Sequence, residues 1–160
     1  MSSWRQQALI EAPAEAVWKL LGDPERYPEW AGFVVEVTGP PVIEKDAEYE
    51  QTTRGPIGKV TTTFRLDRFQ EMREIRMRCQ MSGWYSHWLL TPAAGGTFAE
   101  AEIGIEPTAG RYRLMYGAFG KRYFRRVVEE ALDGLREAIE GRSAEPHAAA
   151  GNGPPPEPRG

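Results

Sequence analysis

Ser86 and His87 are the first residues to examine for chemistry, because a nucleophile beside a general base is the minimum that acyl transfer needs. They are the only adjacent serine and histidine in the chain, and the only other histidine is His147. Neighbouring residues of a strand point to opposite faces of a sheet. If residues 84–91 form a strand, these two side chains cannot act as a pair. His147 lies in the predicted tail, so no histidine is placed for a triad or a metal site.

A second pattern places apolar, aromatic and hydroxyl side chains at alternate positions of residues 58–68, 72–81 and 84–91. Such alternation predicts strands with one buried face. On this face, with a C-terminal helix opposite, we expect Thr62, Phe64, Met77, Cys79, Trp84, Ser86 and Trp88, faced by Tyr116, Phe119 and Tyr123. Apolar walls with a few hydroxyls are typical of a pocket for a flat or hydrophobic molecule. A plain packed core has the same composition.

Arg68 and Arg73 are the cationic exceptions, since both share the parity of the apolar face and lie on either side of the turn at residues 69–72. A guanidinium inside a pocket could donate a fork of hydrogen bonds to ligand oxygens. The alternative is an arginine at the end of a strand that is simply solvated.

Composition narrows the class of protein. A chain of 160 residues, 41% of them hydrophobic, is enough for one domain with a sizeable core. The net charge of −3 gives no general attraction to nucleic acid or anionic membranes, although charge can be clustered locally. Cys79 is the only cysteine, which excludes an intramolecular disulfide. No apolar run is long enough to span a membrane, so we expect a cytoplasmic protein that does not insert into membranes. We also expect no cofactor.

The periodicity predicts an order of elements. We expect a strand over residues 4–11, a helix from Pro13 to Gly22, and a second short helix that begins at Asp23 and is cut by Pro28. Period-two segments follow at 33–38, 47–53, 58–68, 72–81, 84–91 and 97–106, and one helix runs from Gly110 to about 140. Its basic cluster, residues 121–126, could contact a phosphate-bearing partner, but we interpret it as a solvated face with i,i+4 ion pairs from Arg125 to Glu129 and from Arg126 to Glu130. Residues 141–160 contain no aliphatic side chain larger than alanine, which predicts a disordered tail after a domain of residues 1–140.

This order is that of an α+β helix-grip fold, in which a curved antiparallel sheet of about seven strands wraps around the long C-terminal helix. APAEAVWKLLGDPERYPEW, residues 12–30, resembles the start of the START-like, Bet v 1-like (SRPBCC) superfamily, in particular its polyketide cyclase/dehydrase group. LLTPAAGGTFAEAEI, residues 89–103, resembles the late hairpin of the same group. The resemblance implies that the two short helices plug one end of a half-barrel. Trp30 would then touch a ligand or simply fill the core.

The resemblance and the residues together leave three functions open. The first is a binding protein for a hydrophobic natural product or lipid, acting as a monomer or weak homodimer without nucleic acid. The second is a polyketide aromatase/cyclase. GKVTTTFRLDR, residues 58–68, resembles a strand of such enzymes, in which an arginine matching Arg68 orients the substrate. The third is a resistance protein that sequesters a reactive metabolite. The near absence of acid/base groups on the interior face favours the first.

Overall fold

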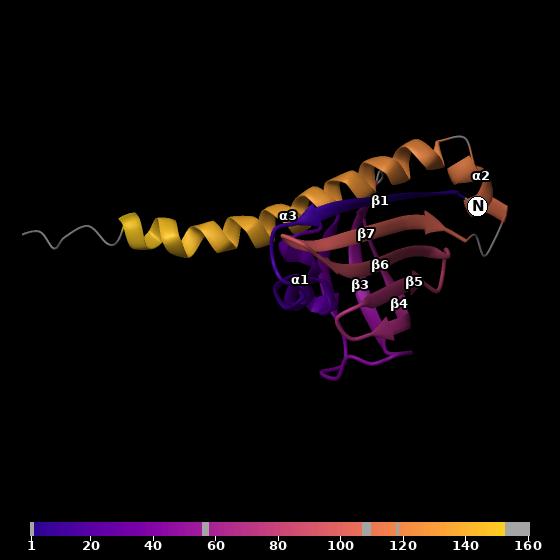
Figure 1. Cartoon of the computed structure of the whole chain (residues 1–160). Coiled ribbons are helices and arrows are strands. Elements are labelled where there is room, and N and C mark those ends of the chain that lie inside the picture. The colour runs from indigo at the N-terminus through magenta and orange to yellow at the C-terminus, as the bar shows by residue number, and fades with distance from the viewer. Residues whose placement is uncertain (1, 56–57, 107–109, 118, 153–160) are drawn as a thin grey trace, which may run out of the picture.

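The computed structural model describes residues 2–55, 58–106, 110–117 and 119–152, and side chains as far as residue 141. Its described strands form one sheet in the order β1-β7-β6-β5-β4-β3-β2, with antiparallel neighbours throughout. The strands are β1 (Ser2–Ile10), β2 (Val34–Thr38), β3 (Glu48–Gly55), β4 (Gly58–Gln70), β5 (Glu74–Cys79), β6 (Trp84–Ala93) and β7 (Gly96–Ile105). Figure 1 shows α3 running along the sheet beside β1. The predicted meander is confirmed.

Two short helices follow β1, as predicted. In α1 (Ala14–Leu21) the side chains of Val17, Leu20 and Leu21 are buried, which is the spacing of one helix face. The second helix, η1 (Pro24–Glu29), is a 3-10 helix that begins after Asp23, whose carboxylate accepts a hydrogen bond from the amide of Glu25 at 3.1 Å. These helices therefore cover one end of the sheet and present Tyr27 and Trp30 to its interior.

The C-terminal helical region differs from the single helix predicted by the sequence. It consists of α2 (Gly110–Gly117) and α3 (Gly120–Asn152). The apolar spacing carries across the break, but glycine on either side of it favours an interruption. The end of α3 also differs, because the helix continues to Asn152 instead of ending near residue 140 and projects beyond the sheet (Figure 1). The alanines of this stretch favour a helical backbone, which composition alone did not indicate. Residues 153–160 of the predicted disordered tail lie outside the described residues.

Close backbone contact fixes α3 against the plug formed by η1. A Cβ at Gly134 would overlap the carbonyl oxygen of Trp30, so only glycine allows this approach. The buried face of α3 carries Phe124, Val127, Val128, Ala131, Leu132, Leu135 and Ile139. Trp30 is thereby held between helix and sheet.

A β-bulge changes the parity of β4 near its end. The pairing with β5 shifts between Leu66 and Arg68, so that Phe69 pairs with Ile75. The ring of Phe69 packs on the core and lies 5.8 Å from the ring of Trp18. The extra residue thus turns Phe69 inward and Arg68 outward.

The outer face of the sheet carries an ion network. Arg76 lies between Asp67 and Glu106, with nitrogen–oxygen distances of 2.6 and 2.7 Å, and only 12% of its side chain is exposed. Its guanidinium also lies 4.5 Å from the centre of the Tyr85 ring. The guanidinium of Arg76 is thus largely desolvated although it lies on the outer face.

Candidate functional site

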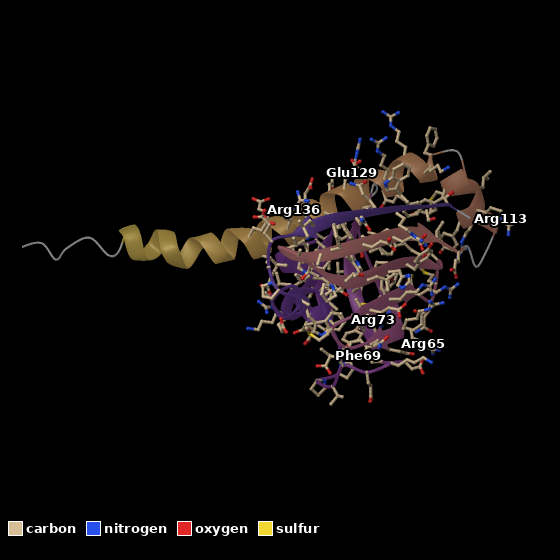
Figure 2. All side chains as sticks on the ribbon, in the orientation of Figure 1. Arg65, Phe69, Arg73, Arg113, Glu129 and Arg136 are labelled. Carbon is tan, nitrogen blue, oxygen red and sulfur yellow. The ribbon has the colours of Figure 1, made fainter. Side chains whose placement is uncertain are left out.

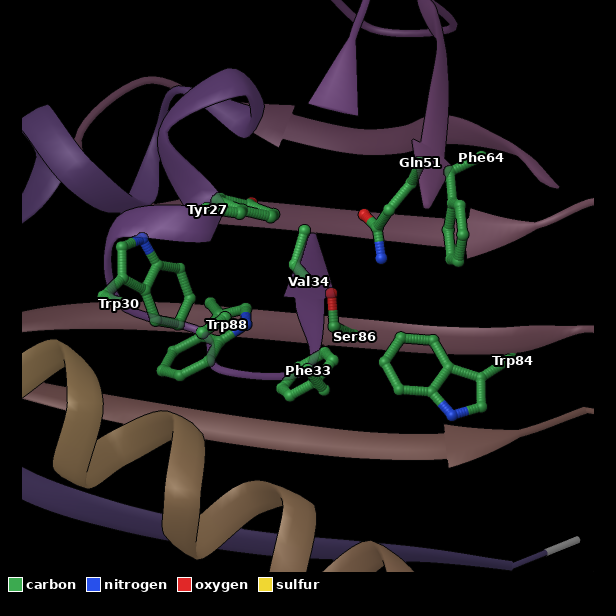
Figure 3. A pocket seen from close by; sticks show the side chains of 10 residues that line it. Tyr27, Trp30, Phe33, Val34, Gln51, Phe64, Trp84, Ser86 and Trp88 are labelled. Carbon is green, nitrogen blue, oxygen red and sulfur yellow. The ribbon is translucent and has the colours of Figure 1, made fainter. Parts of the chain in front are cut away.

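The candidate site is a small pocket between the plug and the inner face of the sheet. Its walls come from η1, the connection to β2, and strands β2, β3, β4 and β6 (Figure 3). They are formed by Tyr27, Trp30, Ala31, Phe33, Val34, Gln51, Phe64, Trp84, Ser86 and Trp88. The cavity measures about 10 Å³, which is the space of about one water molecule. A larger ligand therefore requires the walls to move.

Aromatic rings fill most of the space. The indole of Trp30 donates a hydrogen bond from Nε1 to the carbonyl oxygen of Leu20 at 3.3 Å, which fixes its ring. Its ring meets that of Trp88 edge-on, with centroids 5.3 Å apart. At the other side, the rings of Phe64 and Trp84 are 6.0 Å apart and nearly perpendicular. These rings occupy most of the space under the curved sheet, and only a small cavity remains.

Three polar side chains interrupt the aromatic wall. Tyr27 is 4% exposed, Gln51 3% and Ser86 8%. The Gln51 amide donates to the hydroxyl of Thr53 at 3.0 Å, and Figure 3 shows the side chains of Gln51 and Ser86 pointing toward one another. The hydroxyl of Tyr27 is buried and has no hydrogen-bond partner among the described residues.

Burial raises the pKa of Tyr27 above its ordinary value, and the nearby Tyr49 and Asp23 act in the same direction. The phenol is therefore neutral at physiological pH and can serve as a donor or an acceptor. An unpaired buried hydroxyl costs roughly 1–3 kcal/mol. A ligand oxygen placed beside it would remove that cost.

Of the residues predicted to bind a ligand, the structure brings five together in this pocket. They are Trp30, Phe64, Trp84, Ser86 and Trp88. Four of them occupy alternate positions of β4 and β6, which face the interior, and Trp30 follows η1.

The next predicted group lies inside the fold but outside the pocket wall. Met77 is buried in the core. Cys79 donates from Sγ to the hydroxyl of Thr62 at 3.5 Å. Burial raises the pKa of Cys79, but hydrogen bonds involving Ser82 and Thr62 outweigh burial, and the pKa is lowered overall.

Three predicted residues come from the helical region, and one of them is misplaced. Tyr116 and Tyr123 are half-buried, pack on the core and have ring centroids 5.8 Å apart. Burial raises the pKa of Tyr123 to about 12. Phe119 is 75% exposed, which corrects its predicted place on the interior face. The break between α2 and α3 removes it from the register that the sequence spacing implied.

Arg68 is also misplaced by the sequence analysis. Its side chain is 61% exposed and lies 3.6 Å from a carboxylate oxygen of Glu74, on the outer face. The bulge at Leu66–Arg68 reverses its parity, so a role inside the pocket is withdrawn. Figure 2 shows the neighbouring Phe69 and Arg73 at this end of the sheet.

The structure adds pocket residues that the sequence analysis did not select. Gln51 follows Tyr49 by two positions in β3, so the alternation from that aromatic residue could have placed it inward. Tyr27 precedes Trp30 by three positions, the spacing of one helical turn. Ala31, Phe33 and Val34 lie where the chain leaves the plug; Phe33 and Val34 belong to the predicted strand 33–38, but its alternation did not show which of its residues would reach a pocket.

The expected separation of Ser86 from His87 is confirmed. Ser86 points into the pocket, whereas the imidazole Nε2 of His87 lies 2.7 Å from Glu74 on the outer face. Among the described lining residues there is no carboxylate, imidazole or amine. The arrangement can therefore enclose and hydrogen-bond a molecule, but it has no evident general base.

Comparison with known families agrees with this architecture. The family model described as polyketide cyclase / dehydrase and lipid transport matches residues 1–140, and the chain belongs to that family. No curated protein matches the sequence.

Solved structures share the fold at low identity. The protein TTHA0849 from Thermus thermophilus is 18% identical, with a TM-score of 0.71 over 88% of this chain and 99% of that one. One AHSA1-like protein from Aeromonas hydrophila is 16% identical, with a TM-score of 0.60, and the match covers 88% of this chain and 94% of that one. The di-domain ARO/CYC protein StfQ of the steffimycin biosynthetic pathway is 15% identical, with a TM-score of 0.68 over 89% of this chain and 51% of its own. The predicted helix-grip fold is confirmed.

Proposed function

We propose that the protein binds a small hydrophobic molecule, of aromatic polyketide or lipid type, that carries at least one oxygen. The single observation that carries the proposal is the buried, unpaired hydroxyl of Tyr27 beside an aromatic pocket. Aromatic walls would hold the apolar body, and Tyr27, Gln51 and Ser86 would hold the oxygen. Membership of a family described by polyketide cyclisation and lipid transport supports this substrate class.

Binding is favoured over catalysis by the chemistry of the wall. A cyclase must move protons, and the described lining residues offer only neutral hydroxyls and an amide. Burial keeps Tyr27 protonated, so this phenol could polarise a carbonyl group but could not act as a base near neutral pH. A cyclase activity is the second candidate, supported by the fold shared with StfQ and by these carbonyl-directed donors.

Entry of the ligand requires the pocket to expand from its closed volume of about 10 Å³. Phe33 and Trp84 are the half-buried members of the wall, and their rings are 5.9 Å apart. We expect these two side chains to swing aside, since the more deeply buried Trp30 and Trp88 are fixed by their neighbours. A ligand that selects such an open state stabilises the fold by an amount that grows with the logarithm of its concentration divided by its Kd.

The test uses 2-naphthol and naphthalene, which differ by one hydroxyl group. Both should raise the melting temperature and change tryptophan fluorescence, and 2-naphthol should bind about tenfold more tightly because of its hydrogen bond. Calorimetric titration measures the two affinities. If neither probe changes the melting temperature or the fluorescence at saturation, the pocket is a packed core and the proposal fails.

A further inference from the structure

The corner formed by α2 and the start of α3 exposes large apolar side chains. Leu114 is 84% exposed, Phe119 75% and Met115 55%. These are among the largest exposures of hydrophobic residues in the described chain, and none of the residues of α2 is buried. Exposed single hydrophobics are ordinary, but a group at one corner marks an interaction surface.

The same corner carries a concentration of positive charge. Six of the 20 lysines and arginines, and none of the 23 acidic residues, lie between residues 107 and 128. The six are Arg111, Arg113, Lys121, Arg122, Arg125 and Arg126. A protein with a net charge of −3 thus has a locally cationic end.

These cations are mostly available to a partner. Arg125 pairs with Glu129 at 3.0 Å, as the sequence predicted, and its guanidinium also lies 5.4 Å from the Trp4 ring. Within the described part of the chain, no ion pair joins Arg126 to Glu130, and none involves Arg113 or Arg122. The expectation of a face neutralised by its own acids therefore holds for one pair only.

Helix α2 presents exposed apolar and positively charged side chains on the same side. Tyr112 and Tyr116 pack against the core, and successive helical residues are about 100° apart. Leu114 therefore lies opposite the packed face, with Arg111 and Arg113 on its two flanks. Figure 2 shows Arg113 at the end of the molecule away from the projecting part of α3.

We propose that this corner, residues 111–117 and 119–126, docks on an anionic lipid bilayer surface. The apolar side chains would enter the interface between headgroups and acyl chains, and the cations would contact lipid phosphates and carboxylates. A nucleic acid would leave Leu114 and Phe119 in water, and a second copy would bring two cationic corners together. No described helix is long and apolar enough to cross a membrane, so the contact is peripheral. This inference does not depend on the proposed pocket function.

The experiment is flotation of the full chain with vesicles of phosphatidylcholine, alone or mixed with phosphatidylserine. Binding is expected only with phosphatidylserine and should weaken as salt is raised. Replacing Arg113→Gln together with Arg122→Gln should lower affinity about 25-fold, from about fivefold for each cation. Leu114→Ser should lower it about tenfold or more.

The matched controls lie elsewhere on the surface. They are Arg65→Gln, at a side chain 49% exposed, and Val42→Ser, at a residue 60% exposed. All four variants should keep the wild-type melting temperature, and the controls should keep vesicle binding. Equal binding to both vesicle types, no binding to either, or equal losses in the controls would overturn the proposal. So would a change of oligomeric state in Leu114→Ser without vesicle binding, which would assign the corner to a second copy.

Discussion

The outer face of the sheet and the pocket on its inner face treat buried polar groups in opposite ways. On the outer face, Arg76 has two carboxylate partners within 2.7 Å, and the imidazole of His87 has one. In the interior, the hydroxyls of Tyr27 and Tyr49 are buried without a partner. Asp67 Oδ1 and Arg78 Nε on the outer face also lack a hydrogen bond, but the other carboxylate oxygen of Asp67 pairs with Arg76, and Arg78 Nε itself lies 3.4 Å from a carboxylate oxygen of Glu106.

The difference separates polar groups that stabilise the fold from those that do not. Breaking a desolvated ion pair is costly, because removal of one partner leaves the other charge without its counterion. An unpaired phenol lowers the stability of the empty protein. Tyr27 lines the pocket and Tyr49 does not, so the two phenols form a natural test pair.

The largest effect is expected on the outer face. Arg76→Ala removes both of its ion pairs, but Glu106 is 41% exposed and keeps Arg78 as a partner, so the free energy of unfolding should fall by about 2 kcal/mol. Binding of 2-naphthol should be unchanged once the variant is folded. Urea unfolding measures the first quantity and calorimetry the second.

Arg65→Ala is the matched control, because this arginine is 49% exposed and its nearest carboxylate oxygen is 3.7 Å away. This substitution should lower the free energy of unfolding by less than about 1 kcal/mol. If the two substitutions destabilise the protein equally, the outer network is not the desolvated structure described above.

Alkaline pH should reveal the buried phenol of Tyr27. Its folded-state pKa lies above the ordinary value of 10.0, so the unfolded chain releases this proton first. The contribution of Tyr27 to the free energy of unfolding is therefore constant below about pH 10. Above that pH, the free energy of unfolding falls as the pH rises toward the folded-state pKa, by up to about 1.4 kcal/mol per pH unit. The free energies of unfolding of the wild type and of Tyr27→Phe, measured between pH 9 and 11, give this slope for each protein. Identical slopes would contradict the burial of this phenol.

Gln51 tests whether the pocket's amide serves the ligand more than the fold. Gln51→Met keeps the length of the side chain and removes its hydrogen bond to Thr53. The free energy of unfolding should therefore change by less than about 1 kcal/mol. The affinity for 2-naphthol should fall about tenfold, with naphthalene unaffected. Loss of both affinities together would indicate a change of pocket shape instead of a lost hydrogen bond.

The smallest effect is expected from the C-terminus. Among the described side chains of α3, which reach residue 141, the last buried one is Ile139. We propose that the domain ends near residue 140 and that truncation after Gly141 leaves the free energy of unfolding and probe binding unchanged. The melting temperatures of the two chains provide the measurement. A drop of several degrees in the shorter chain would show that the tail packs on the domain.

The sequence predicted the fold more completely than the site. Strand alternation placed Trp84, Ser86 and Trp88 correctly, because period two fixes which face a side chain occupies. It failed at Arg68, where a bulge inserts one residue and reverses the parity, and no local sequence signal marked the bulge. It failed at Phe119 because helix spacing was carried across a break.

The pocket volume was beyond prediction for a different reason. Whether aromatic rings line a space or fill it depends on their rotamers and on the approach of η1 to α3, which is set by the contact of Gly134 with Trp30. The hydrogen-bond partner of a buried phenol is likewise a property of the assembled structure. Tyr27 therefore stands out only in three dimensions.

The most direct test of the pocket is the paired substitution of Tyr27→Phe and Tyr49→Phe. Each removes one unpaired buried hydroxyl, so each should raise the free energy of unfolding by about 1 kcal/mol. Only Tyr27→Phe should lower the affinity for 2-naphthol, by about tenfold, and neither substitution should change the affinity for naphthalene. Full affinity of Tyr27→Phe for 2-naphthol, or an equal loss in Tyr49→Phe, would contradict a ligand-binding role for the Tyr27 hydroxyl.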